Sequence, residues 1–276
     1  SDFAFGAEDY TIELWIYSRT LSATQRIFGQ RASDAGSLQM LLETNASGVL
    51  SYYFSIGDSS KQLGTTVVTQ INTWHHIAIT RLSGTHTLYV DGVSVATNST
   101  SGSLDDRAEP FSIGRQGNYT SDNFNGYVSN LRICKGHAVY TGNFTVPTRE
   151  LPVHKAPPKG VVFPAADNLT VLLACQSSTD ATLDSSGRHT LTANGNVHAQ
   201  SANPGLLRRT NISSTITENT GSVFFDNSGD YLVPPVDDDE LILGDTYSIE
   251  WWHYLSEIGT GDKRHGFIMA ASAETT

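Results

Sequence analysis

A strand-like motif occurs twice in the chain, about one domain length apart. The sequence Tyr10–Tyr17 (YTIELWIY) returns as Tyr247–Tyr254 (YSIEWWHY), with Tyr, Ile, Glu, Trp and Tyr at matching positions. The copies are separated by 247 − 10 = 237 residues, which is far longer than the repeat of a solenoid or a propeller blade. Each unit should therefore be a whole domain with its own core, and the chain should be a segment of a tandem array.

The repeated motif has the alternation of a half-buried β-strand. One face carries the apolar residues Ile12, Leu14 and Ile16, and the other face carries Thr11, Glu13, Trp15 and Tyr17. Successive side chains of a strand point to opposite sides of a sheet, so this pattern predicts one face against a core.

Turn signals separate several further runs with strand character. Asn45-Ala46-Ser47-Gly48 lies between two β-prone runs, and Asp91-Gly92 between two alternating runs predicts a two-residue type I′ hairpin. The predicted strands are Gln39–Leu42, Leu50–Ile56, Trp74–Arg81, Leu88–Val90, Val93–Val95, Phe111–Gly114 and Tyr127–Ile133. Short strands at regular spacing, without a helical period, predict an all-β, two-sheet antiparallel jelly-roll sandwich.

The composition changes to a proline-rich run after the first set of strands. We predict a first module at residues 1–152 that lacks its first strands, an extended connector at 153–166, and the N-terminal part of a second module at 167–276. Three arrangements would complete the sheets. The chain can be an excerpt of a longer array, which we favour, the strands of 169–232 can fold back to complete the first unit as a permuted single domain, or a neighbouring chain can supply strands.

Charge and cysteine content exclude some classes of partner. The chain has 17 Lys and Arg against 28 Asp and Glu, a formal charge of −11, which opposes binding to nucleic acid or to an anionic membrane. No apolar run is long enough to insert into a membrane.

We predict that Cys134 and Cys175 are two isolated thiols, as suits assembly in a reducing cytoplasm.

The order of short motifs resembles that of laminin-G-like modules with a concanavalin A-like lectin/glucanase fold. These motifs are Leu172-Leu173, Asp184-Ser185-Ser186-Gly187, His189–Thr192, Phe225-Asp226, Gly229–Leu232, Tyr247–Glu250, Trp74–Ala78, Leu88–Gly92 and Gly126–Arg132. More narrowly, Ser129–Gly136, Ala138–Thr141 and Asn143–Thr145 resemble modules of virion proteins from tailed, especially marine, bacteriophages.

This resemblance implies a non-enzymatic structural or binding module on the virion surface, in a tail fibre or capsid appendage assembled in the host cytoplasm. Its expected partners are host surface polysaccharides or glycans and other virion proteins, and a homo-oligomer is expected. Two alternatives stay open: a secreted or cell-surface bacterial carbohydrate-binding adhesin, and a β-glucan hydrolase.

Catalytic groups are not visible in the sequence. Glycoside hydrolysis needs two carboxyl groups ~5 to 10 Å apart, whereas the strands with Glu13 and Glu250 each offer one carboxylate. We therefore interpret Glu13 as a carboxylate on the less buried sheet face or as a partner of a neighbouring polar group. His75 and His76 are adjacent in a strand and point to opposite faces, so they cannot share one metal ion.

Two sets of loop residues are candidates for ligand binding. The loop with Asn118, Tyr119, Asp122 and Asn123 combines an aromatic ring with amide and carboxylate groups, which suits a sugar. Modules of this fold often bind calcium through loop oxygens, and the carboxylates in the matching motifs are Asp184, Asp226 and Asp230. Asp and Asn in turns also bond to their own backbone, so both readings stay open.

Overall fold

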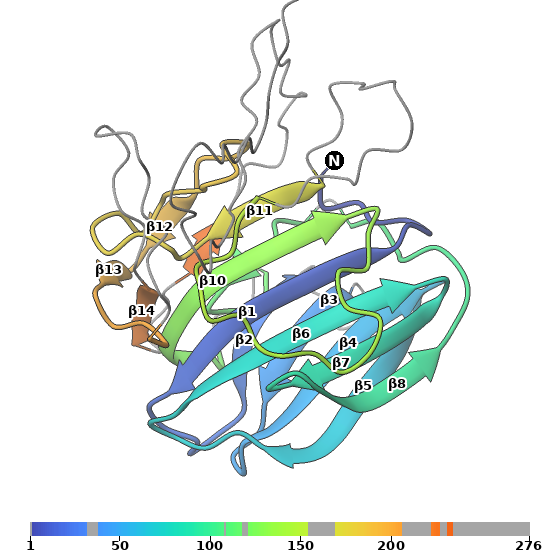
Figure 1. Ribbon diagram of the computed structural model, residues 1–276, viewed down its shortest axis with the longest axis horizontal. Helices are drawn as coiled ribbons and strands as arrows, with labels where there is room; N and C mark the ends of the chain where they lie inside the picture. The colour runs from blue at the N-terminus through green and yellow to red at the C-terminus, as the bar shows by residue number, and fades with distance from the viewer. Residues whose placement is uncertain are drawn as a thin grey trace, which may run out of the picture. The chain divides into compact units, whose positions relative to one another are not determined.

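The computed structural model describes residues 2–31, 38–107, 109–117, 121–153, 169–205, 222–226 and 231–233, the last two ranges by their backbone. The described residues form two stacked antiparallel sheets and no helix (Figure 1). The predicted all-β sandwich is therefore confirmed. No helix in the described part of the chain has the length and apolar character needed to cross a membrane.

The first sheet contains eight strands, in the order β13-β14-β10-β1-β6-β7-β8, and β11 pairs with β10 beside β14. Their bounds are β1 Tyr10–Ser18, β6 Trp74–Leu82, β7 Thr85–Val90, β8 Val93–Ser99, β10 Asn125–Lys135, β11 Thr170–Ala174, β13 His198–Gln200 and β14 Ser222–Asp226. β1 is central, because it pairs along its length with both β10 and β6.

The second sheet contains seven strands, in the order β12-β15-β9-β2-β3-β4-β5. Their bounds are β2 Gln25–Arg31, β3 Leu38–Thr44, β4 Val49–Ile56, β5 Ser59–Val68, β9 Ser112–Ile113, β12 Thr192–Asn194 and β15 Tyr231–Val233. β2 and β5 were not predicted, because Gln25–Arg31 lacks a clean apolar alternation and β5 is largely polar and half exposed.

The core lies between the two sheets and is built by the predicted alternation. Ile12, Leu14 and Ile16 from β1 belong to it, together with Tyr52 and Phe54 from the facing sheet. Burying such side chains contributes about 1.5–3 kcal/mol each. The outer face of β1 is also buried, since Glu13 has no exposed surface and Trp15 is 8% exposed.

The segment 136–152 covers this outer face. The Val139 N–H donates to Thr11 Oγ1 at 2.8 Å, and the Phe144 N–H donates to the Gly92 carbonyl at 2.9 Å. Figure 1 shows the segment crossing in front of β10, β1 and β6. It crosses β1 away from the arrowhead of that strand (Figure 1).

The hairpin between β7 and β8 has the predicted turn. Asp91 and Gly92 both have positive φ, 50° and 80°, as a type I′ turn requires. A Cβ on Gly92 would lie 2.0 Å from the Phe144 carbonyl oxygen. Glycine is therefore needed here both for φ and for the close approach of segment 136–152.

The strands after the proline-rich run extend the same two sheets. β11 and β14 pair with β10, and β15 pairs with β9. This is the fold-back arrangement, and the described strands all lie in the compact unit Ser1–Leu241. It satisfies the β10 backbone groups that would otherwise form an open edge. The second copy of the motif, Tyr247–Tyr254, lies outside the described residues. The division of the chain into modules at 1–152, 153–166 and 167–276 therefore stays a prediction.

Cys134 and Cys175 are both free and buried, which confirms the two isolated thiols. Burial raises the pKa of the Cys134 thiol to about 11, so neither the thiolate nor its nucleophilic chemistry is favoured at neutral pH.

Candidate functional site

An open hollow lies on the outer face of the seven-stranded sheet. Its volume is about 380 Å³, and it is lined by Arg26, Arg31, Leu38, Leu41, Glu43, Tyr53, Ser55, Asp58 and Ser60. The alternation of β3 and β4 explains this lining. Leu42, Tyr52 and Phe54 point into the core, so their neighbours point outward.

Arg26 holds two carboxylates at one side of the hollow. Its Nη2 lies 3.0 Å from Asp122 Oδ2, and its Nε lies 3.8 Å from Glu43 Oε2. The three side chains are 14%, 35% and 19% exposed in the order Arg26, Asp122, Glu43. The loop around Asp122 is thereby attached to the edge of the hollow.

Tyr53 and Glu43 form a polar pair inside the hollow. Gln62 Nε2 donates to the Tyr53 hydroxyl at 3.0 Å, and Tyr53 also hydrogen bonds with Glu43. Burial raises the pKa of Glu43, an effect that Arg26 partly offsets. Burial and the Glu43 carboxylate raise the pKa of the Tyr53 hydroxyl. The phenol therefore stays a neutral donor and acceptor at physiological pH.

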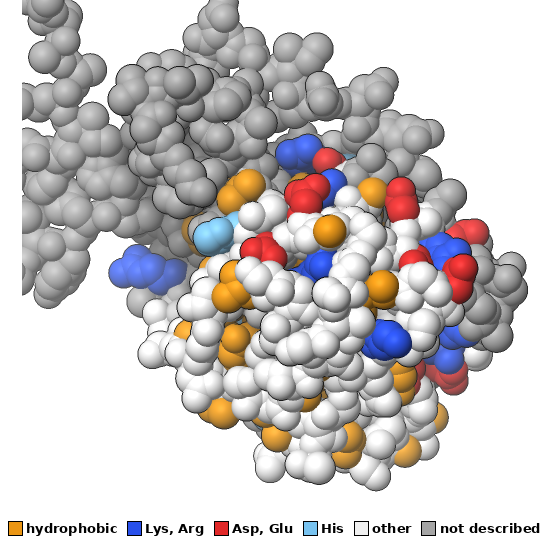
Figure 2. Space-filling model, turned by 90° about the vertical axis from the view of Figure 1, so that its right-hand side faces the viewer, with side chains coloured by type: hydrophobic (Ala, Val, Ile, Leu, Met, Phe, Trp, Pro, Cys, Tyr) orange, Lys and Arg blue, Asp and Glu red, His pale blue; other side chains and the backbone are white. Residues whose placement is uncertain are grey.

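The opposite rim is fixed by a carboxylate-capped turn. Asp105 accepts hydrogen bonds from the N–H groups of Gly57 and Asp58, at 2.7 and 2.9 Å. Arg107 contacts Asp58 and also lies 3.1 Å from Asp105. Figure 2 views the molecule from the right-hand side of Figure 1, and on this side charged side chains of both signs gather in the upper part, with few in the lower part.

The hollow therefore presents an aromatic ring, hydroxyls, guanidinium donors and carboxylate acceptors on a rigid sheet. Such a set can hydrogen bond the hydroxyls of a polar ligand and contact an apolar ring face. Glu43 and Asp122 share one guanidinium, so neither is a free acid or base facing a bond to be cleaved.

The predicted glycan residues are only partly brought together. Asp122 lies at the hollow through Arg26. Asn123 is 4% exposed, and its part in ligand binding stays a prediction. Asn118 and Tyr119 lie outside the described residues.

Of the three predicted metal residues, Asp184 is the one whose side chain the structure describes. Asp184 accepts four hydrogen bonds, from the N–H groups of Leu173, Ser186 and His189 and from the Ser186 hydroxyl, at 2.6 to 3.0 Å. Both of its carboxylate oxygens are therefore used in this turn. The described residues include no group of three metal-ligating side chains.

Strand pairing places the backbone of Asp226, a second predicted metal residue, far from that of Asp184. Asp226 pairs with Asn125, whereas Asp184 bridges Ala174, which pairs with Leu131 further along β10. The offset on β10 is 131 − 125 = 6 residues, or roughly 20 Å. The Asp226 side chain and Asp230 lie outside the described residues, and calcium binding stays a prediction.

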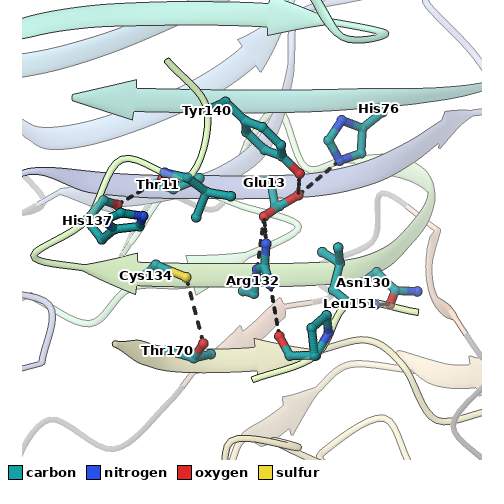
Figure 3. A network of polar contacts seen from close by, with 12 residues as sticks. Thr11, Glu13, His76, Asn130, Arg132, Cys134, His137, Tyr140, Leu151 and Thr170 are labelled. Carbon is teal, nitrogen blue, oxygen red and sulfur yellow. Dashed lines mark hydrogen bonds and ion pairs between the residues drawn. The ribbon is translucent and has the colours of Figure 1, made fainter. Parts of the chain in front are cut away.

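Glu13 is the centre of a buried polar network on the other sheet (Figure 3). It accepts hydrogen bonds from Arg132 Nε at 2.9 Å and from the Tyr140 hydroxyl at 2.7 Å, and His76 Nε2 lies 3.3 Å away. Burial would raise the pKa of Glu13, but Arg132 and the hydrogen bonds of His76 and Tyr140 lower it to about 2.

The interpretation of Glu13 as a partner of polar groups is confirmed, and its placement on a less buried face is wrong. The face is buried because segment 136–152 covers it. His75 and His76 do point to different surroundings: His75 Nδ1 lies 2.8 Å from Asp91 Oδ2, and His76 contacts Glu13. Glu250 lies outside the described residues.

Sequence reasoning missed the residues that form the hollow. For Tyr53 and Ser55 a signal was available, because they alternate with Leu50, Tyr52 and Phe54 in a predicted strand. Arg26 and Arg31 belong to a strand that was not predicted, so no pattern placed them on this face.

Comparisons with known proteins agree with the architecture. The family model for the concanavalin A-like lectin/glucanases superfamily, of laminin-G type, matches residues 1–138. No curated protein matches the chain.

Three solved structures illustrate the similarity of fold. A candidate carbohydrate-binding protein from Bacteroides ovatus is 17% identical, with 66% of this chain and 51% of that chain covered and a TM-score of 0.46. Domains LG4-5 of the mouse laminin alpha1 chain are 23% identical, with 48% and 36% covered and a TM-score of 0.35. Domain 4 of a GH43 extracellular arabinanase from Geobacillus stearothermophilus, in complex with arabinotriose, is 19% identical, with 49% and 64% covered and a TM-score of 0.36. The chain thus spans less than two thirds of each.

Proposed function

The chain belongs to the concanavalin A-like lectin/glucanases superfamily, and from this premise we propose that it is a non-catalytic glycan-binding module. The binding site is the hollow on the outer face of β2, β3, β4 and β5. The observation that carries the proposal is the grouping of Tyr53, Arg31, Glu43, Ser55 and Ser60 around that hollow.

The chemistry of this lining suits a saccharide. A sugar ring offers a rim of hydroxyls that both donate and accept, together with apolar C–H faces. Arg31 donates, Glu43 accepts, the Ser55 and Ser60 hydroxyls do both, and Tyr53 adds a ring. These residues stand on adjacent strands, so the site needs little ordering on binding.

The setting that we propose is the surface of a bacteriophage particle. The module would project from a tail fibre or capsid appendage, as a homo-oligomer, and contact host surface glycans and other virion proteins. The resemblance of Ser129–Gly136, Ala138–Thr141 and Asn143–Thr145 to phage virion modules supports this setting. Detection of the chain by a specific antibody on purified particles tests it. Its presence on a bacterial cell wall instead would support the adhesin alternative.

A hydrolase is less favoured by the geometry. Glu43 has the raised pKa of a general acid, yet the other nearby carboxylate, Asp122, is bound to the same Arg26. A reducing-sugar assay on β-glucans tests this alternative, and release of sugar by the wild type but not by Glu43→Gln would support it.

A glycan array with wild type and variants tests the binding site. Tyr53→Ala and Arg31→Gln should each weaken the wild-type signals at least ~10-fold, because each removes a direct contact of about 1.4 kcal/mol or more. Val93→Ser, on exposed β8, is the matched control and should bind like the wild type.

The array should be run with calcium and with EDTA. Signals that depend on calcium would support the predicted calcium site, and equal signals would place binding on protein groups alone. An array on which both hollow variants match the wild type would contradict the proposed site.

A further inference from the structure

We propose a second sugar-binding site on the opposite sheet, formed by Tyr17, Trp74 and Tyr127, which takes the apolar face of a neutral sugar ring. This inference rests on the proposed function, since it adds a second site to a glycan-binding module. The two sites would lie on the outer faces of the two sheets, so one module could engage two glycan chains.

The three rings come from three adjacent strands at one level of the eight-stranded sheet. Tyr17 of β1 pairs directly with Tyr127 of β10 and with Trp74 of β6. The ring centroids are 5.5 Å apart for Tyr17 and Trp74, 5.6 Å for Tyr17 and Tyr127, and 6.3 Å for Trp74 and Tyr127.

The rings lie on the outer face rather than in the core. Ile16, Ile77 and Val128 belong to the core cluster, so the alternation of each strand turns the three aromatic residues outward. Each is partly exposed.

The rings differ from the other aromatic residues of this face by their surroundings. Tyr140 and Phe144 of the covering segment stack on each other with centroids 3.6 Å apart, and Phe144 packs edge-on to His76. That segment does not extend over the end of β1 (Figure 1). The Tyr17, Trp74 and Tyr127 rings thus form a local aromatic cluster beside that segment, and each of the three residues is partly exposed.

The three rings are inclined to one another. The angle between ring planes is 57° for Tyr17 and Trp74, 72° for Tyr17 and Tyr127, and 44° for Trp74 and Tyr127. An inclined ring on each side of a stacked sugar can contact its C–H faces and its edge, and the Tyr hydroxyls can bond its rim.

Two buried polar groups lie on the strands that carry the cluster. The Trp15 side chain precedes Tyr17 on the same face, and His76 follows Trp74 on the same face. Within the described part of the chain, Trp15 Nε1 and His76 Nδ1 are buried without a hydrogen-bond partner.

The ligand class follows from the side chains. The cluster itself carries no charge, in contrast to the hollow with its arginines and carboxylates. A neutral ring, such as a glucose or arabinose unit, therefore fits the cluster better than an acidic sugar.

The test measures binding of neutral hexasaccharides, namely cellohexaose, laminarihexaose and arabinohexaose, by isothermal titration calorimetry. The double variant Tyr17→Ser/Tyr127→Ser should weaken binding of the recognised hexasaccharide at least ~10-fold, or abolish it. Trp74→Phe, which keeps a ring, should remain within ~3-fold of the wild type. Val93→Ser, on exposed β8, is the control and should bind like the wild type.

A second measurement does not depend on the stability of the double variant. In the wild type, the indole N–H resonance of Trp74, assigned by its absence in Trp74→Phe, should shift on addition of the hexasaccharide. An unshifted resonance, or no binding of any of the three, would overturn the proposal.

The outcomes also separate the two sites. Loss of all binding in Tyr53→Ala, with the Tyr17→Ser/Tyr127→Ser protein still binding, would overturn the second site and leave the proposed function standing. Loss of hexasaccharide binding only in the double variant would support the second site even if the hollow variants were unaffected on the array.

Discussion

The carboxylate of Glu13 lies against the guanidinium of Arg132 on the neighbouring strand, with side-chain exposures of 0% and 5%. Arg132 Nη1 also donates to the Pro152 carbonyl at 2.9 Å, and the Tyr140 hydroxyl donates to Glu13 at 2.7 Å. The ion pair therefore connects two central strands to both ends of the segment that covers them.

Glu13→Gln should destabilise the fold by about 3–5 kcal/mol, because it leaves the Arg132 charge buried without its partner. Urea unfolding followed by fluorescence measures the loss. Glu8→Gln is the control: Glu8 is 55% exposed and 3.9 Å from Lys135, so its loss should cost less than ~1 kcal/mol. Equal effects of the two substitutions would contradict the role of burial.

Stability should fall as the pH is lowered below 6.5, through His86. Burial, with a smaller effect of Arg81, lowers the pKa of His86 from 6.5 to about 3. Between these values the unfolded chain binds a proton that the folded chain does not. The contribution of the uncharged His86 ring to the free energy of unfolding is therefore complete above pH 6.5. It is lost as the pH falls toward 3, at up to ~1.4 kcal/mol per pH unit.

Urea unfolding at several pH values from 7 to 5 measures this effect, since the Glu13 carboxyl titrates only at lower pH. In His86→Phe the slope should be smaller, because the ring stacked on Phe54 at 3.8 Å remains while the titrating group is gone. Identical slopes for the two proteins would rule out His86 as the cause.

Gly92→Ala should destabilise the fold more than Gly57→Ala. Both glycines have positive φ, 80° and 59°, but a Cβ at Gly92 would lie 2.0 Å from the Phe144 carbonyl oxygen, whereas at Gly57 no atom lies within 4 Å. Gly57→Ala should cost roughly 1–2 kcal/mol from backbone strain alone. Gly92→Ala should lower the melting temperature further, as measured by calorimetry, and similar values would argue against the close packing of segment 136–152 on the hairpin.

Asp184→Ala should destabilise the fold by about 1–3 kcal/mol, because it leaves buried N–H donors of the turn without their acceptor. The loss should be the same in calcium and in EDTA if the carboxylate serves the turn. A difference in melting temperature between wild type and variant that appears only with calcium would show that Asp184 is a ligand.

Local pattern predicted much of the architecture. The alternation in Tyr10–Tyr17, the Asn45–Gly48 turn and the Asp91-Gly92 hairpin each depend on neighbouring residues, and each is found in the structure. β2 and β5 were missed because their polar residues give no alternation when read alone. Their position is set by pairing with β3 and β4.

The sequence by itself determined the class of fold, the apolar face of each main strand and the hairpin turns, because these follow from side-chain alternation and backbone preferences over a few residues. Only the tertiary structure decided that Glu13 is buried against Arg132, that Arg26 joins Asp122 to Glu43, and that Tyr17, Trp74 and Tyr127 form one cluster. Each of these contacts joins residues that are distant in the sequence. Strand pairing and the path of segment 136–152 bring them together, and no local pattern encodes either one.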